Sequence, residues 1–133
     1  MGRVVRWESE VVAFAQEIVR LPSPSGEEGS VAAAVEAEMR LLGYDPVERD
    51  ALGSVVGVVR GALPGGTVLI DAHMDTVPPG EPSEWTHPPF GGDVDSGRLW
   101  GRGAVDVKGS LAAAVVAAGS LPRERLAGAV IVS

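Results

Sequence analysis

The chain has 133 residues, the length of one ordinary domain, and its 45% hydrophobic and 22% charged residues are typical of a folded globular protein. A formal net charge of -7 disfavours a nucleic-acid partner, because phosphate binding depends on Lys and Arg side chains. The sequence has no cysteine, which excludes disulfides and thiolate metal sites, so any metal must be held by His, Asp or Glu.

Neither a membrane span nor an export signal is predicted. The longest apolar stretch, residues 111–118, is far shorter than the ~20 residues that cross a bilayer. The first ten residues include Arg3, Arg6 and Glu8 and lack the apolar core of a secretory signal. We therefore expect a cytoplasmic protein with no membrane partner.

The first half of the chain predicts two helices followed by two strands. Apolar residues recur at helical spacing over residues 10–21, with Ser9 as the cap and the Pro- and Gly-containing stretch 22–26 as the end. A second helix is predicted over residues 27–42, where Gly43 stops it. The strands are predicted over residues 45–49 and 54–60.

The second half predicts strands, one long loop and one helix. Residues 61–67 read as a turn, and residues 68–70 begin an apolar run typical of a buried parallel strand. Residues 78–97 form a Pro- and Gly-rich loop, and a loop of that length is usually functional. A short strand at residues 98–100, a helix at 110–118 and a buried strand at 129–132 follow.

This alternation of helices and apolar strands predicts an α/β domain with a mostly parallel central sheet flanked by helices. Ligands of such sheets bind beyond the carboxyl ends of the strands. Asp71, His73 and Asp75 fall at such an end, directly after residues 68–70. We therefore expect the functional site there.

His73 and Asp75 are the first candidate site residues. Side chains two apart in an extended segment point to the same side, so an imidazole and a carboxylate can share one space. A ligating His commonly donates its second ring N–H to a carboxylate. One His-x-Asp pair is common by chance, but here an apolar strand precedes it and a long loop and a Gly-rich segment follow it.

Asp106 is the third candidate, between Gly103 and Gly109 in that Gly-rich segment. Flexible backbone on both sides lets its carboxylate be aimed at one point, and one carboxylate can bridge two cations. Two divalent ions about 3.5–4 Å apart polarise an amide carbonyl and activate a shared water, which suits hydrolysis. A two-metal hydrolase is therefore the favoured interpretation.

Competing motifs fail on detail. A P-loop needs Gly-Lys-Ser/Thr, whereas the order here is Lys108-Gly109-Ser110. A dinucleotide fingerprint has Asp106 where its third glycine belongs, and no Gly-x-Ser-x-Gly elbow offers a serine nucleophile. His87, flanked by Pro88 and Pro89, fits a loop better than a metal site.

The motifs in this sequence resemble those of the co-catalytic zinc hydrolases that include acetylornithine deacetylase, succinyl-diaminopimelate desuccinylase, aminoacylase and glutamate carboxypeptidase. The resemblance covers nearly the whole chain, as the amino-terminal part of such an enzyme. It rests on four segments, which are residues 21–28 (LPSPSGEE), 73–78 (HMDTVP), 85–90 (WTHPPF) and 101–109 (GRGAVDVKG).

The resemblance implies a role for each candidate residue. His73 would bind one zinc ion, the catalytic residue Asp75 would orient His73, and Asp106 would bridge two zinc ions, with cobalt as a possible substitute. The peptide bond between Asp106 and Val107 would be cis. Family members carry a Glu-Glu pair after a strand like residues 129–132, followed by further ligands and a lid domain, all beyond Ser133.

We therefore expect residues 1–133 to be a partial catalytic domain, without the lid domain and the carboxyl-terminal half. The expected function is zinc-dependent hydrolysis of amide bonds in N-acyl amino acids or peptides, as a deacylase or peptidase. Because the metal site is incomplete, we expect the isolated chain to be inactive. The alternative is a truncated or split, non-catalytic domain that needs a complementary chain or forms a homo-oligomer.

Overall fold

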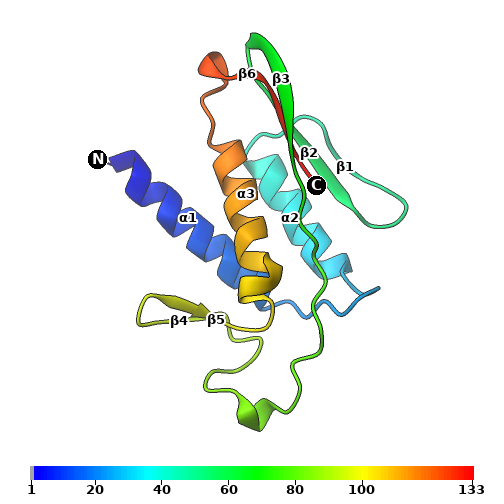
Figure 1. Ribbon diagram of the computed structural model, residues 1–133, viewed down its shortest axis with the longest axis vertical. Coiled ribbons are helices and arrows are strands. Elements are labelled where there is room, and N and C mark those ends of the chain that lie inside the picture. The colour runs from blue at the N-terminus through cyan, green and yellow to red at the C-terminus, as the bar shows by residue number, and fades with distance from the viewer. Residues whose placement is uncertain (1) are drawn as a thin grey trace.

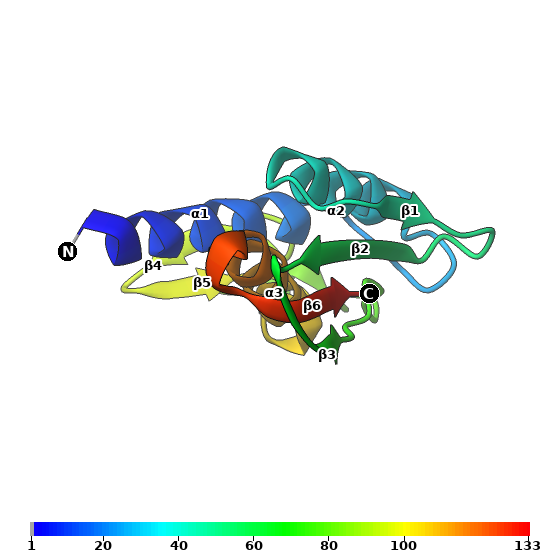
Figure 2. The ribbon, with the colours of Figure 1, turned by 90° about the horizontal axis from the view of Figure 1, so that it is seen from above.

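Two helices cover one face of a four-stranded sheet, and a third helix packs against them (Figures 1 and 2). The computed structural model describes the backbone of residues 2–133 and the side chains of residues 8–133. The helices are α1 (Gly2–Val19), α2 (Gly29–Leu41) and α3 (Gly109–Gly119). α2 and α3 touch the sheet, whereas α1 lies against the other two helices.

The predicted helices are confirmed, but the start of the first one is wrong. α1 begins at Gly2 and runs through Ser9, which therefore does not cap it. Residues 3–8 include neither Pro nor Gly, so nothing in the sequence breaks the helix before Ser9. α2 and α3 lie within two residues of their expected bounds.

The main sheet has the order β1-β2-β6-β3. Its strands are β1 (Val47–Arg49), β2 (Val55–Arg60), β3 (Leu63–Ile70) and β6 (Ala127–Val132). β3 and β6 are parallel, whereas β1 with β2 and β2 with β6 are antiparallel. The α/β class is confirmed, but the mostly parallel sheet is wrong, because β1 and β2 form a hairpin and β6 runs opposite to β2.

β3 departs from its prediction in two ways. Residues 63–67, expected to be a turn, belong to the strand. Glycine makes this possible, because a Cβ on Gly65 would lie 2.6 Å from the carbonyl carbon of Ala127 on β6. Residues 68–70 were expected to be buried, but β3 is an edge strand and exposes 58% of Val68 and 62% of Leu69.

The core lies between the helices and the sheet. It is a single cluster, with fully buried side chains from every helix and from the two central strands, among them Ile18, Met39, Leu111, Val115, Val59 and Val132. The core fixes α3 against β6, and the end of β3 lies beside β6. The segments that follow β3 and precede α3 are positioned by this packing.

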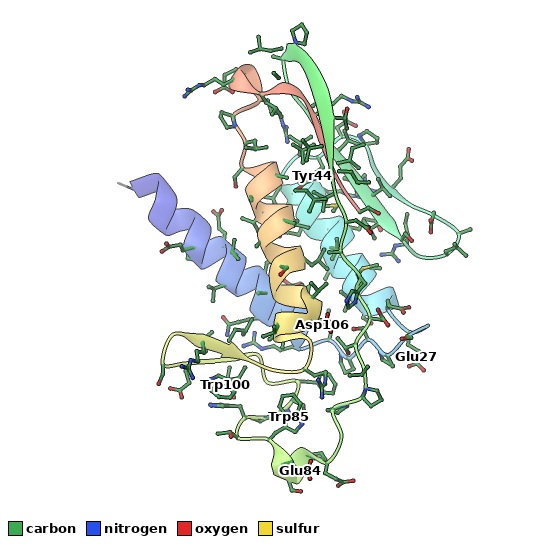
Figure 3. All side chains as sticks on the ribbon, in the orientation of Figure 1. Glu27, Tyr44, Glu84, Trp85, Trp100 and Asp106 are labelled. Carbon is green, nitrogen blue, oxygen red and sulfur yellow. The ribbon has the colours of Figure 1, made fainter. Side chains whose placement is uncertain are left out.

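Residues 78–97 form a self-packed loop at the end of the molecule where α3 begins (Figure 1). The loop includes η1 (Pro82–Glu84) and the strand β4 (Asp93–Asp95), which pairs with the expected strand β5 (Arg98–Trp100). Trp85 Nε1 donates to Pro79 O at 2.8 Å, and the ring of Trp100 lies 4.6 Å from that of His87. Both tryptophans are labelled in Figure 3.

No helix within the described residues combines the length and the apolarity that a bilayer crossing requires.

Candidate metal site

His73 and Asp106 face each other from two segments that are far apart in the sequence. His73 lies on the extended segment after β3, and Asp106 lies in η2 (Ala104–Lys108), the irregular turn that leads into α3. The distance from His73 Nε2 to Asp106 Oδ1 is 3.1 Å. Figure 3 labels Asp106 at this end of α3, beside the extended segment. The expected meeting of the two motifs is therefore present.

The backbone at Asp106 is irregular, as its glycine-rich surroundings predict. Its φ of -123° and ψ of 92° lie outside the helical region, although the residues around it form a helical turn. The peptide bond between Asp106 and Val107 is cis, as the resemblance implied. This geometry carries the carboxylate out of the turn, where 87% of the side chain is exposed.

The other ring nitrogen of His73 faces Asp75. Nδ1 lies 3.0 Å from the backbone oxygen of Asp75 and 3.1 Å from its Oδ1. A carbonyl oxygen can only accept, so Nδ1 can donate to it, and when Nδ1 carries the single proton of the neutral ring, Nε2 holds a lone pair. Partial burial disfavours the charged ring, but the hydrogen bonds and charges of Asp106 and Asp75 raise the pKa of His73.

Ser25 holds the second oxygen of the Asp75 carboxylate. Its hydroxyl donates to Asp75 Oδ2, while Oδ1 of the same carboxylate faces the imidazole. The hydrogen bond from Ser25 is the main cause that lowers the pKa of Asp75, with His73 adding to it. Asp75 is therefore ionised at neutral pH and bound on both sides.

Two side chains offer metal donors at one point. Imidazole nitrogen and carboxylate oxygen both suit zinc, and the 3.1 Å between His73 Nε2 and Asp106 Oδ1 is a separation that two donors at about 2.0–2.1 Å from one cation can have. Asp75 contacts the opposite ring nitrogen, which is the position of a residue that orients a ligating His. Among the described residues, no group of three or more His, Cys, Asp or Glu side chains could hold a metal ion.

Two cavities meet at His73. The smaller, about 310 Å³, is lined by His73, Asp75 and Asp106, so it is the one that contains the facing donors. The larger, about 600 Å³, lies at the ends of the strands and is lined by His73, Asp75 and Asp71 but not by Asp106. Because His73 and Asp106 both line the smaller cavity, it is the candidate metal position, and the larger cavity adjoins it.

The remaining sequence candidates divide between this site and the loop. Asp71 lines the larger cavity and no contact places it at the donor pair. His87 lies in the loop, where Nδ1 is 3.3 Å from Asp93 and Nε2 is 3.8 Å from Asp95. Those carboxylates contact opposite nitrogens, so the three side chains do not converge on one point.

Residues 21–26 contribute to the site in a way that was not predicted from the sequence. Besides Ser25, this segment contains Ser23, which is fully buried and donates to Met74 O at 2.8 Å. Lys108, also fully buried, donates from Nζ to Leu21 O at 2.6 Å. Burial lowers the pKa of Lys108 to about 8. The turn-forming sequence of this segment gives no signal that it contacts the site.

Comparison with known proteins confirms the family resemblance. Residues 69–132, which include His73, Asp75 and Asp106, match the model described as Peptidase family M20/M25/M40. The matched segment is therefore similar to part of that family's domain. A succinyl-diaminopimelate desuccinylase of Methylobacterium sp. (strain 4-46) is 39% identical over 121 residues, covering 86% of this chain and 30% of that protein. A succinyl-diaminopimelate desuccinylase from Cereibacter sphaeroides (strain ATCC 17029 / ATH 2.4.9) is 38% identical over 109 residues, covering 80% of this chain and 29% of that protein.

Solved structures share the fold. An M20 family metallo-carboxypeptidase from Sulfolobus solfataricus is 26% identical with a TM-score of 0.78, over 92% of this chain and 30% of that one. A dinuclear metal binding peptidase of the M20 family from Bacillus subtilis, at 18% identity, has a TM-score of 0.70 over 96% of this chain and 35% of that one. This chain thus spans about 30% of the length of the curated relatives it matches.

Proposed function

We propose that this chain forms part of the catalytic domain of a zinc-dependent hydrolase that cleaves amide bonds in N-acyl amino acids or peptides. The observation that carries the proposal is the pair His73 Nε2 and Asp106 Oδ1, 3.1 Å apart at the ends of two separate segments. The names of the related proteins support amide hydrolysis. A cytoplasmic location remains part of the proposal.

Each residue has one role in the proposed site. His73 and Asp106 would hold one cation, and Asp106 would be shared with a second cation. Asp75 accepts a hydrogen bond from His73 Nδ1–H and so would keep the lone pair of Nε2 available to the cation. Zinc bound at this site, or cobalt in its place, would supply the polarisation of the amide carbonyl and the activation of water.

The described residues supply too few ligands for a tight site, because zinc normally takes three or four protein ligands. The chain also spans only about 30% of its relatives. We therefore expect the isolated chain to bind zinc weakly and to have no hydrolase activity. Turnover of N-succinyl or N-acetyl amino acids, or of dipeptides, by the isolated chain with zinc or cobalt would contradict this expectation.

Zinc titration followed by NMR tests the assignment of the donors. We expect zinc to shift the ring signals of His73 and the backbone signals around Asp106, and His73→Ala or Asp106→Asn to abolish those shifts. The matched control is His87→Ala, which removes the only other histidine and should leave them unchanged. Equal zinc-induced shifts around residue 106 with and without His73 would overturn the assignment.

The edge strand β3 favours a second candidate, a domain that associates with another chain. β3 exposes Val68 and Leu69, and its outer edge pairs with no strand in the described part of the chain. Exposed apolar edge strands are surfaces at which chains pair. Tight zinc binding by a dimer in sedimentation and calorimetry would support a self-completing oligomer, whereas a monomer that binds zinc weakly would contradict it.

A further inference from the structure

The segment of residues 21–26 touches both parts of the chain that carry the donor residues. Toward the first part, Ser23 makes two backbone-directed contacts, since its hydroxyl donates to Met74 O and its carbonyl accepts from Thr76 N, both at 2.8 Å. Toward the second part, Leu21 O accepts from Lys108 Nζ at 2.6 Å. One short segment therefore holds both sides of the site in place.

The two contacts of Ser23 flank Asp75 in the sequence. They fix the backbone on either side of the carboxylate, and Ser23 itself is fully buried, so this connection is shielded from solvent. Ser25 follows two residues later and is thereby held next to the Asp75 side chain. Because Ser25 is exposed, its hydrogen bond to Asp75 is separable from the packing of the segment.

The imidazole of His73 lies between two carboxylates. In the neutral ring only one nitrogen carries a proton, and each carboxylate favours the proton on the nitrogen that it faces. Asp106 Oδ1 at Nε2 favours the tautomer protonated there, which cannot ligate a metal through that nitrogen. Asp75 favours the tautomer with a free Nε2 through two acceptors at Nδ1, its backbone oxygen at 3.0 Å and its Oδ1 at 3.1 Å, and the second one acts only while the carboxylate faces the ring. The orientation of the Asp75 carboxylate thus shifts the balance between the two tautomers.

We propose that Ser25 is a positioning residue that locks the Asp75 carboxylate toward His73 Nδ1 and thereby keeps Nε2 free as a metal donor. The hydroxyl engages Oδ2, so the rotation that would turn Oδ1 toward solvent breaks a hydrogen bond. This inference rests on the proposed function, because a free Nε2 has a role only if it binds a metal. The tautomer itself is a property of the metal-free chain and can be measured whether or not zinc binds.

Long-range proton–nitrogen NMR of the histidine ring, in the metal-free chain at a pH where the ring is neutral, measures the tautomer directly. We expect wild type to be mainly protonated at Nδ1, and Ser25→Ala to raise the ratio of the Nε2-protonated to the Nδ1-protonated form roughly two- to tenfold, as the loss of one hydrogen bond predicts. Ser25→Thr retains the hydroxyl and should restore the wild-type ratio.

Two comparisons distinguish positioning from a general structural effect. Ser96→Ala removes another serine-to-aspartate hydrogen bond, the one to Asp95, and should leave the ratio unchanged. In an Asp75→Ala background, Ser25→Ala should add no further change, because Ser25 acts through Asp75. An unchanged ratio in Ser25→Ala, or an equal change in the Asp75→Ala background, would overturn the inference.

Failure of this inference and failure of the proposed function give different results. If the tautomer responds as expected but zinc shifts neither His73 nor Asp106, the positioning role of Ser25 stands and the metal proposal falls. If zinc binds at His73 and Asp106 but the tautomer ratio is unchanged in Ser25→Ala, the metal proposal stands and the positioning role falls.

Discussion

Lys108 is the only lysine in the sequence, and the structure buries it completely. Its Nζ donates to Leu21 O at 2.6 Å, so the buried ammonium is hydrogen-bonded to a carbonyl. Desolvation lowers its pKa from 10.5 to about 8. Replacing it with methionine, Lys108→Met, keeps an unbranched apolar stem and removes the titrating group.

The lowered pKa fixes the sign of the pH dependence. Between pH 8 and 10.5 the unfolded chain holds the lysine proton more firmly than the native chain, so unfolding takes up a proton and the free energy of unfolding rises with pH. From pH 7 to pH 10 the gain from this group is about 2.5 kcal/mol. Conversely, that stability is lost as the pH falls from the unfolded pKa through the folded one.

Urea unfolding of wild type and Lys108→Met at several pH values between 7 and 10 provides the test. At pH 7 we expect the two proteins to differ little, because the variant avoids burying a charge but leaves Leu21 O without its donor, at a cost of about 1–3 kcal/mol. At pH 10 the variant should be less stable than wild type by about 2–3 kcal/mol.

Other groups that titrate in this range cancel in the comparison. The amino terminus is the same in both proteins. Burial raises the pKa of Tyr44, so this residue opposes stability only as pH rises toward and above 10, and equally in both. Parallel stability curves for wild type and Lys108→Met would refute the reasoning, because they would mean that the lysine keeps an ordinary pKa in the folded chain.

Three further substitutions test the packing. Tyr44→Phe should cost about 1–2 kcal/mol in urea unfolding, because it removes the buried hydrogen bond of 2.7 Å from the hydroxyl to Val115 O; an unchanged midpoint would contradict this. Gly128→Ala should cost more than about 3 kcal/mol or prevent folding, because φ is +82° and the added Cβ would lie 1.8 Å from Gly66 O. Leu52→Ala should change stability by less than about 0.5 kcal/mol, since Leu52 is 93% exposed, and a larger effect would contradict its placement.

The elements with strong periodic patterns could be predicted from the sequence. α2, α3 and β6 lie close to their expected bounds because apolar spacing and flanking Gly or Pro define them locally. The direction of the strands could not be predicted in this way. β6 enters the sheet between β2 and β3 and runs antiparallel to β2, a long-range choice that no local spacing expresses.

The errors in β3 and β4 have local physical causes. In β3, Gly65 breaks the apolar pattern, yet it serves the strand because only glycine allows the backbone of Ala127 to approach so closely. β4 was missed inside the long loop, although Ser96 and Gly97 were available as a hairpin signal. Both have positive φ, 51° and 75°, as a two-residue turn between paired strands requires.

The meeting of His73 with Asp75 and Asp106 was predictable because the spacing of these residues and their glycine-rich context are local features of the sequence. His73 and Asp106 lie where the two motifs were expected to meet, and Asp75 contacts the ring nitrogen expected for it. Ser25 was not predictable, because its contact with Asp75 spans 50 positions and depends on how the segment of residues 21–26 docks. Supporting contacts of this kind become visible only when the tertiary structure is known.

The solitary buried amine gives this chain an intrinsic chemical probe. Reagents that acylate primary amines do not reach the single lysine side chain in the native structure, because it is enclosed. Modification of Lys108 therefore requires the structure around it to open, and the rate of that modification reports how often η2 separates from residues 21–26. Mass spectrometry of the labelled chain can follow this opening without any engineered label.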